Sequence, residues 1–102
     1  MVLQLLNKGI DYFMEESFAN FDELEKNVKR GGEIEFIYNN KSFSITHFCE
    51  NGRHKISVMQ AYNYDSEKIF DIEEISNIGN YTIDGEKLKN IISHCQIVFR
   101  CF

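Results

Sequence analysis

The feature of this sequence that most constrains its fold is an alternation of apolar and polar residues over residues 33–60. Ile34 and Phe36 alternate with glutamates at the start of this stretch, and the same period of two continues to residue 60. The chain contains no proline, so its turns depend on Asn, Asp and Gly. Asn39-Asn40 and Asn51-Gly52 interrupt the alternation, and Asn-Gly is a strong hairpin signal. The pattern predicts three antiparallel strands in a meander.

Helical signals lie on both sides of this meander. Asn20 followed by Glu23 predicts a capped helix that ends at Gly31-Gly32. The spacing of apolar residues in 1–16 predicts a further N-terminal helix. After the meander, residues 68–70 suggest a brief strand. Asp71 is placed to cap a short helix carrying Ile72, Ile75 and Ile78, and Asp84 or Gly85 to start another carrying Leu88, Ile91, Ile92 and Cys95.

These elements together predict an α+β fold in a single domain, residues 1–102. We expect one antiparallel sheet of about four to five strands, built from the meander 33–60 and a C-terminal strand at 96–102, with helices packed on one face. The length suits one domain, and 43% hydrophobic residues are enough for one core.

The charge balance and the cysteine count narrow the classes of function. A net charge of −5 disfavours direct nucleic-acid binding, which usually requires a basic surface. Three cysteines without a CxxC pair favour a reducing cytoplasm over a disulfide framework or a zinc ribbon. The N-terminal residues have the pattern of neither a signal peptide nor a membrane span.

Four side chains offer metal or nucleophile chemistry: His47, Cys49, His94 and Cys95. They could form a zinc site or a Cys–His nucleophile pair, but neither pair has a zinc-finger spacing, and Cys95 completes an apolar helix face. We favour structural cysteines and an exposed histidine. The sequence contains no phosphate-binding glycine loop and no hydrolase or metalloprotease signature. We therefore expect no enzyme activity, no catalytic or metal-binding residues and no cofactor.

The acidic residues are concentrated in one segment. Residues 65–86 contain seven acids and one lysine, a net charge of −6. Tyr62 and Tyr64 precede this segment, and tyrosine beside carboxylates suits an interface with a basic protein, although a solvated helix face is the simpler alternative. The expected partner-binding residues are Asp65, Glu67, Asp71, Glu73, Glu74, Asp84, Glu86, Tyr62 and Tyr64. The alternative binding surface is an exposed sheet face with Arg53, Lys55 and His47.

The order of the elements carries a family resemblance. A capped helix leads into GGEIEFIYNNKSFSI at 31–45, followed by DIEEI at 71–75 and IDGEKLKNI at 83–91. This arrangement, over about residues 20–95, resembles the small bacterial immunity proteins of contact-dependent growth inhibition and related polymorphic toxin systems. The resemblance implies a cytoplasmic, stoichiometric inhibitor of a cognate toxin domain, often a basic nuclease. Two other classes stay open: a metal protein or small enzyme using the His/Cys set, and a structural or regulatory subunit of another complex.

Overall fold

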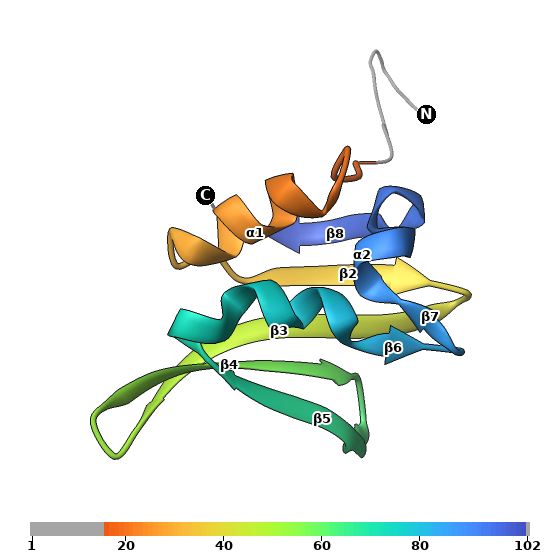
Figure 1. Ribbon diagram of the computed structural model, residues 1–102. Helices are drawn as coiled ribbons and strands as arrows, with labels where there is room; N and C mark the ends of the chain where they lie inside the picture. The colour runs from red at the N-terminus through yellow and green to blue at the C-terminus, as the bar shows by residue number, and fades with distance from the viewer. Residues whose placement is uncertain (1–15, 102) are drawn as a thin grey trace.

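A computed structural model describes residues 16–101 and shows one five-stranded antiparallel sheet with helices on one side. The strands lie in the order β5-β4-β3-β2-β8 (Figure 1). Their bounds are β2 Ile34–Tyr38, β3 Lys41–Glu50, β4 Arg53–Gln60, β5 Asn63–Asp71 and β8 Gln96–Arg100. This confirms the predicted α+β class and a sheet at the upper end of the expected strand number.

The meander forms where the turn residues predicted it. Asn39 and Asn40 have φ of 52° and 62°, and Asn51 and Gly52 have φ of 53° and 75°. Both turns therefore use left-handed residues, which match the twist of the flanking strands. The meander continues one strand further than the sequence indicated, because residues 63–71 form all of β5 and not only a brief strand at 68–70.

The helix before the sheet, α1 (Phe21–Lys29), has the predicted N-cap. The Asn20 side chain accepts a hydrogen bond from the Glu23 amide at 3.0 Å, and the Glu23 carboxylate accepts one from the Ala19 amide at 3.0 Å. Leu24 and Val28 are buried against the sheet. Two free helix-start amides are thus satisfied locally, while the apolar stripe fixes which side of the helix faces inward.

The segment between β5 and β8 differs in detail from the prediction. The region after Asp71 is η1 (Ile72–Asn80), a series of 3₁₀ turns, and the Asp71 side chain makes no capping bond. Asp84 and Gly85, predicted to start a helix, form the turn of a small hairpin, β6 (Thr82–Ile83) and β7 (Glu86–Lys87), with φ of 52° and 83°. Short helical turns follow, α2 (Leu88–Ile91) and η2 (Ile92–His94). Asp-Gly is a favoured two-residue hairpin turn, and here this preference prevails over capping.

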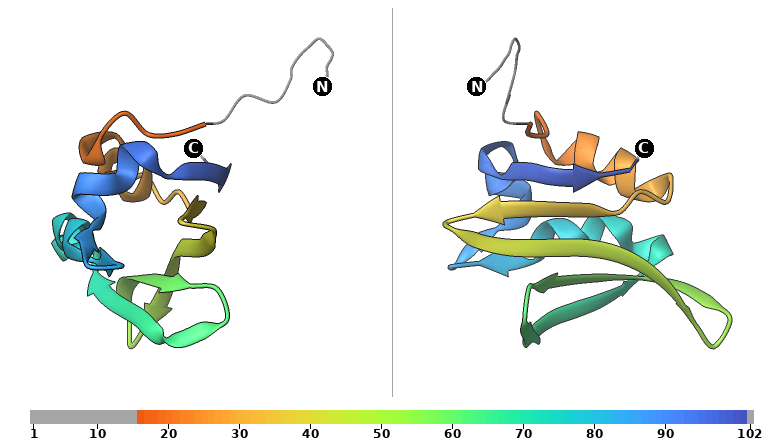
Figure 2. Two further views of the ribbon diagram at one scale, coloured as in Figure 1. Left: turned by 90° about the vertical axis from the view of Figure 1, so that its right-hand side faces the viewer. Right: turned by 180° about the vertical axis from the view of Figure 1, so that it is seen from behind.

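The core lies between the sheet and the layer formed by α1, η1, α2 and η2 (Figure 2). The sheet contributes alternate residues of each strand, such as Phe36, Phe43 and Ile45, and the Phe36 and Phe43 rings stack with centroids 5.2 Å apart. The chain then crosses this layer from β5 at one edge of the sheet to β8 at the other. We call the opposite side of the sheet, which these helices do not cover, the open face.

The predicted N-terminal helix, residues 1–16, lies outside the described residues except for Glu16. The Glu16 carbonyl accepts a hydrogen bond from the Ile97 amide at 2.7 Å, so the chain joins the fold beside β8. None of the helices in residues 16–101 has the length and apolar character needed to cross a membrane.

Candidate functional site

The edge strand β5 carries the first of the residues predicted to bind a partner. It is the outermost strand on its side of the sheet, and no described element lies beyond it in Figure 1. Asp65, Glu67 and Asp71 belong to this strand, and Glu73 and Glu74 follow it at the start of η1. We refer to residues 61–74 as the β5 edge.

Two exposed tyrosines lie where the chain enters this strand: Tyr62 in the turn before it and Tyr64 as its second residue. Tyr62 is 95% exposed and Tyr64 is 77% exposed, and their role as interface anchors stays a prediction. Tyr62 has a φ of 63°, a left-handed conformation that costs a bulky residue roughly 1–2 kcal/mol and is usually given to Gly, Asn or Asp. The turn therefore displays a large aromatic ring in water at a position where its backbone favours a smaller residue.

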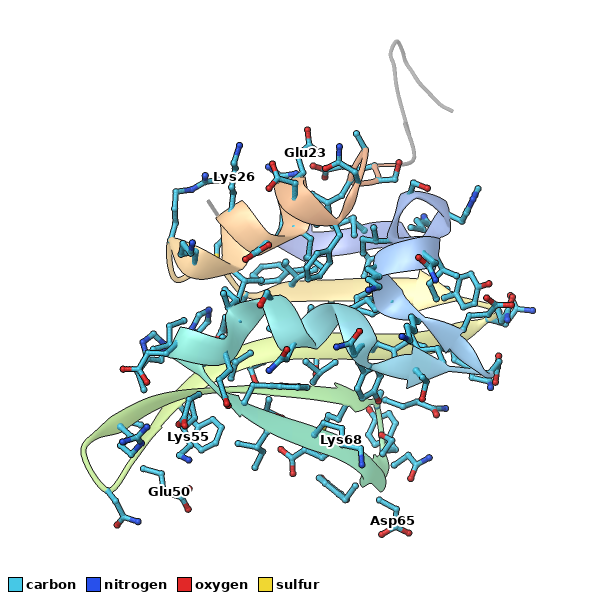
Figure 3. The ribbon with its side chains drawn as sticks, in the orientation of Figure 1. Glu23, Lys26, Glu50, Lys55, Asp65 and Lys68 are labelled. Carbon is cyan, nitrogen blue, oxygen red and sulfur yellow. The ribbon has the colours of Figure 1, made fainter. Side chains whose placement is uncertain are left out.

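The seven predicted acids do not form one cluster. Asp65 lies at one end of β5, and Asp71, Glu73 and Glu74 lie at the other, roughly 20 Å away for six residues of extended chain. Lys68 lies on the strand between them, and Figure 3 shows it on β5 with Asp65 near one end of that strand. The sequence window therefore divides into separate acidic patches, which suit an extended partner better than a single buried cation.

Four of the seven acids have partners within the chain. Glu67 accepts a hydrogen bond from the Ser57 hydroxyl at 2.5 Å, and Glu73 lies 3.7 Å from Arg53 Nη2.

Asp71 and Asp84 each have two such partners. Asp71 accepts from Arg53 Nη2 at 3.0 Å and lies 3.3 Å from Lys55 Nζ, and these cations hold the pKa of its carboxyl below the usual value. Asp84 forms an ion pair with Lys41 at 2.6 Å and accepts a hydrogen bond from the Asn39 amide at 3.0 Å. Lys41 and Asn39 likewise lower its pKa.

Asp84 and Glu86 therefore belong to a different place from the β5 edge. Asp84 connects the β6–β7 hairpin to the β2–β3 turn, and Glu86 lies exposed on β7. The ion pair of Asp84 with Lys41 holds the small hairpin against the sheet, which gives Asp84 a structural role within the chain. The exposed carboxylates of the β5 edge are Asp65, Glu67, Glu73 and Glu74, of which Glu67 already accepts from Ser57 and Glu73 already pairs with Arg53.

A cavity of about 380 Å³ lies between β5 and the turns that follow it. One wall consists of alternate residues of the strand, Ser66, Lys68 and Phe70. The opposite wall comes from η1 and the residues after it: Asn77, Asn80, Tyr81 and Thr82. The Tyr81 hydroxyl donates a hydrogen bond to the Ser66 carbonyl at 2.9 Å and so joins the two walls.

The four predicted metal or nucleophile residues do not meet. His47 Nε2 lies 2.9 Å from the Gly32 carbonyl, at the end of the sheet where β8 finishes, whereas His94 and Cys95 immediately precede β8. Burial raises the pKa of the Cys95 thiol to about 11, which suits a structural cysteine. Within residues 16–101 no group of three or more His, Cys, Asp or Glu side chains is arranged to hold a metal ion.

His47 instead pairs with His54, a residue that the sequence reasoning did not select. Nδ1 of His47 lies 2.7 Å from Nε2 of His54. Because a carbonyl can only accept, His47 donates from Nε2 to Gly32, and in its neutral form its Nδ1 accepts from His54. The Asn51-Gly52 turn fixes the register of β3 and β4, in which Cys49 lies opposite His54. This turn is therefore the sequence signal from which the contact between His47 and His54 could have been predicted.

The alternative surface of Arg53, Lys55 and His47 is not one face. Lys55 pairs with Phe48, and His47 pairs with Ile56, so Lys55 and His47 point to opposite sides of the sheet. The prediction that they share an exposed sheet face is wrong, because adjacent positions along a strand alternate in direction.

No protein-family model, curated protein or solved structure matches this chain.

Proposed function

We propose that this chain is a protein-binding protein that neutralises a basic toxin domain by stoichiometric association, as an immunity protein does. The proposal takes its partner class from the resemblance of residues 20–95 and its binding surface from the β5 edge. Exposed tyrosine is a common anchor at protein interfaces, and neighbouring carboxylates accelerate association with a basic partner.

The observation that carries the proposal is the conformation of Tyr62. A fully exposed ring contributes little to folding, and a left-handed tyrosine opposes it. A residue that costs the fold free energy while presenting an aromatic ring to solvent is best explained by a contact outside the chain. The exposed carboxylates at both ends of β5 support a cationic surface as the partner in this proposal.

The decisive variant is Tyr62→Asn. Asparagine tolerates a positive φ, so we expect the variant to be at least as stable as the natural chain, by up to about 1 kcal/mol. We expect its affinity for the partner to fall by about tenfold or more, the usual loss when a central interface aromatic is truncated. Weaker binding by a more stable protein cannot be attributed to unfolding. A matched control is Phe99→Thr, which removes a half-exposed aromatic ring at the opposite edge of the sheet.

The partner tested in this experiment is the product of the adjacent upstream gene, where the immunity proposal expects the toxin. We expect a one-to-one complex that abolishes toxin activity and weakens as salt rises, because exposed charges are screened. Failure to form that complex at low salt would overturn the immunity proposal and favour a subunit of another assembly. A complex that Tyr62→Asn leaves intact would move the interface away from the β5 edge.

A further inference from the structure

We propose that the partner binds by adding an extended, basic segment to β5 as a sixth strand of the sheet. This inference deepens the proposed function by naming the mode of docking and the chemistry of the docked segment.

The register of the sheet shows which backbone groups of β5 face outward. The two-residue turn at Asn51-Gly52 makes Glu50 and Arg53 a hydrogen-bonded pair, and hydrogen-bonded and non-hydrogen-bonded pairs alternate from there. The odd-numbered residues of β4 thus bond to β3 and its even-numbered residues bond to β5.

The consequence for β5 follows from its pairing with β4. Val58 pairs with Lys68 and Ile56 pairs with Phe70, so these residues of β5 direct their amide and carbonyl groups inward. The residues between and beside them, Ile69 and Glu67, direct theirs away from the sheet. The regular part of this edge covers residues 68–71, because the pairing of β5 with β4 shifts register between Val58 and Gln60. An antiparallel or parallel strand laid along this part would find outward donors and acceptors.

The cavity beside β5 adds a place for side chains of the docked segment. Ser66, Lys68 and Phe70 line it from the strand, and Tyr81 closes its inner end by bonding to Ser66. Side chains of an added strand would alternate between this cavity and the open face. The cavity has apolar rings, one ammonium group and amide and hydroxyl groups, so it suits an uncharged polar or aromatic side chain.

The charges of the edge determine which kind of strand can bind. Glu67 shares the open face with Ile69, and Asp65 and Glu73 lie near the two ends of the strand. Side chains on the open-face side of an added strand would lie beside these carboxylates, which favours Lys or Arg there. A second copy of this chain would bring a second acidic edge against the first, so the same charges disfavour pairing between copies.

The test uses a random library of twelve-residue peptides displayed on phage and selected on the full chain. Enriched peptides are then synthesised and titrated against two variants at one position, Ile69→Pro and Ile69→Thr. Both remove the isoleucine side chain, but only proline removes the outward amide, and proline is tolerated where an edge amide faces solvent.

We expect the enriched peptides to be net positive. We expect their affinity to fall by about tenfold or more in Ile69→Pro, through loss of a backbone hydrogen bond and ring hindrance, and by less than about threefold in Ile69→Thr. Equal binding by the two variants, enrichment of peptides that are not basic, or no enrichment would overturn the inference.

Amide hydrogen exchange provides a measurement that does not depend on the proline variant folding. In the natural chain, the amides of Glu67 and Ile69 should exchange fast when free and slow at least about tenfold with saturating peptide. Docking through side chains alone would leave these two amides fast. The toxin separates the two proposals: a neutralising complex that Ile69→Pro does not weaken overturns strand addition only, whereas edge-bound basic peptides without a toxin complex overturn the immunity proposal only.

Discussion

The hydrogen bond from the Tyr81 hydroxyl to the Ser66 carbonyl allows a sharp prediction, because it joins the two walls of the β5 cavity. The change is Tyr81→Phe, which deletes one oxygen atom and keeps the buried ring. A net intramolecular hydrogen bond contributes about 1 kcal/mol to folding. Ser66 is only half-buried, so water can reach its carbonyl once the hydroxyl is gone, and the full penalty of a buried unsatisfied group does not apply.

We therefore expect Tyr81→Phe to lower the free energy of unfolding by about 1 kcal/mol, measured by urea denaturation with an unchanged slope. For a domain of this size the same change lowers the melting temperature by about 4–8 °C. The Ser66 amide should exchange faster, since this end of β5 loses its tether to Tyr81.

The matched control removes the same atom from an exposed ring. Tyr62→Phe takes a hydroxyl out of open water and should change stability by less than about 0.5 kcal/mol. If both variants behave alike, the Tyr81 bond contributes nothing and the cavity walls are not joined as described. A loss above about 3 kcal/mol would also refute the reasoning, because it would require further buried partners for the Tyr81 hydroxyl.

Three further predictions follow from close packing, ion pairing and burial. Gly32→Ala should destabilise the chain by about 2 kcal/mol or more, because the new methyl would lie 2.5 Å from a backbone carbonyl oxygen. Gly52→Ala would meet no atom within 4 Å, so it should cost only the roughly 1 kcal/mol of its positive φ. Urea unfolding compares the two variants. Asp71→Asn should be less stable than the natural chain at pH 7, and the difference should vanish in acid. A carboxyl whose pKa is lowered in the folded state stabilises the fold above its unfolded pKa, and this stabilisation is lost as the pH falls through the folded pKa. Unfolding midpoints at pH 7 and below pH 3 test this prediction. At pH 8, iodoacetamide should label exposed Cys49 readily and Cys95 only on unfolding. A pKa of about 11 leaves roughly one Cys95 thiol in a thousand ionised at this pH. Equal labelling rates of the two cysteines, measured by mass spectrometry, would contradict the burial of Cys95.

Local chemistry was sufficient to predict most elements of this fold. The cap of α1 depends on side chains three residues apart, and the turns at Asn39-Asn40 and Asn51-Gly52 depend on residues that tolerate positive φ. The alternation in β2, β3 and β4 reports directly which side of the sheet is buried. Each of these signals depends on a few neighbouring residues, so it can be interpreted without knowing how the rest of the chain packs.

Where local preferences competed, the role predicted for a single residue was wrong. Asp71 has the right position to cap a helix, but Arg53 and Lys55 on the neighbouring strand take its carboxylate. Asp84-Gly85 suits either a helix start or a hairpin turn, and the contact of Asp84 with Lys41 of β3 favours the hairpin. These outcomes depend on residues more than 15 positions away in the chain, which a local reading does not include.

The sequence by itself therefore determined the fold class, the meander and the cap of α1, because each follows from period, turn chemistry or a contact between near neighbours. Only the tertiary structure decided that β5 is an edge strand, that its acids separate into two patches, and that Ser66 and Tyr81 border one cavity. Strand order and the crossing from β5 to β8 bring together groups that are distant along the chain. A binding surface made of such groups becomes visible only once the chain has packed.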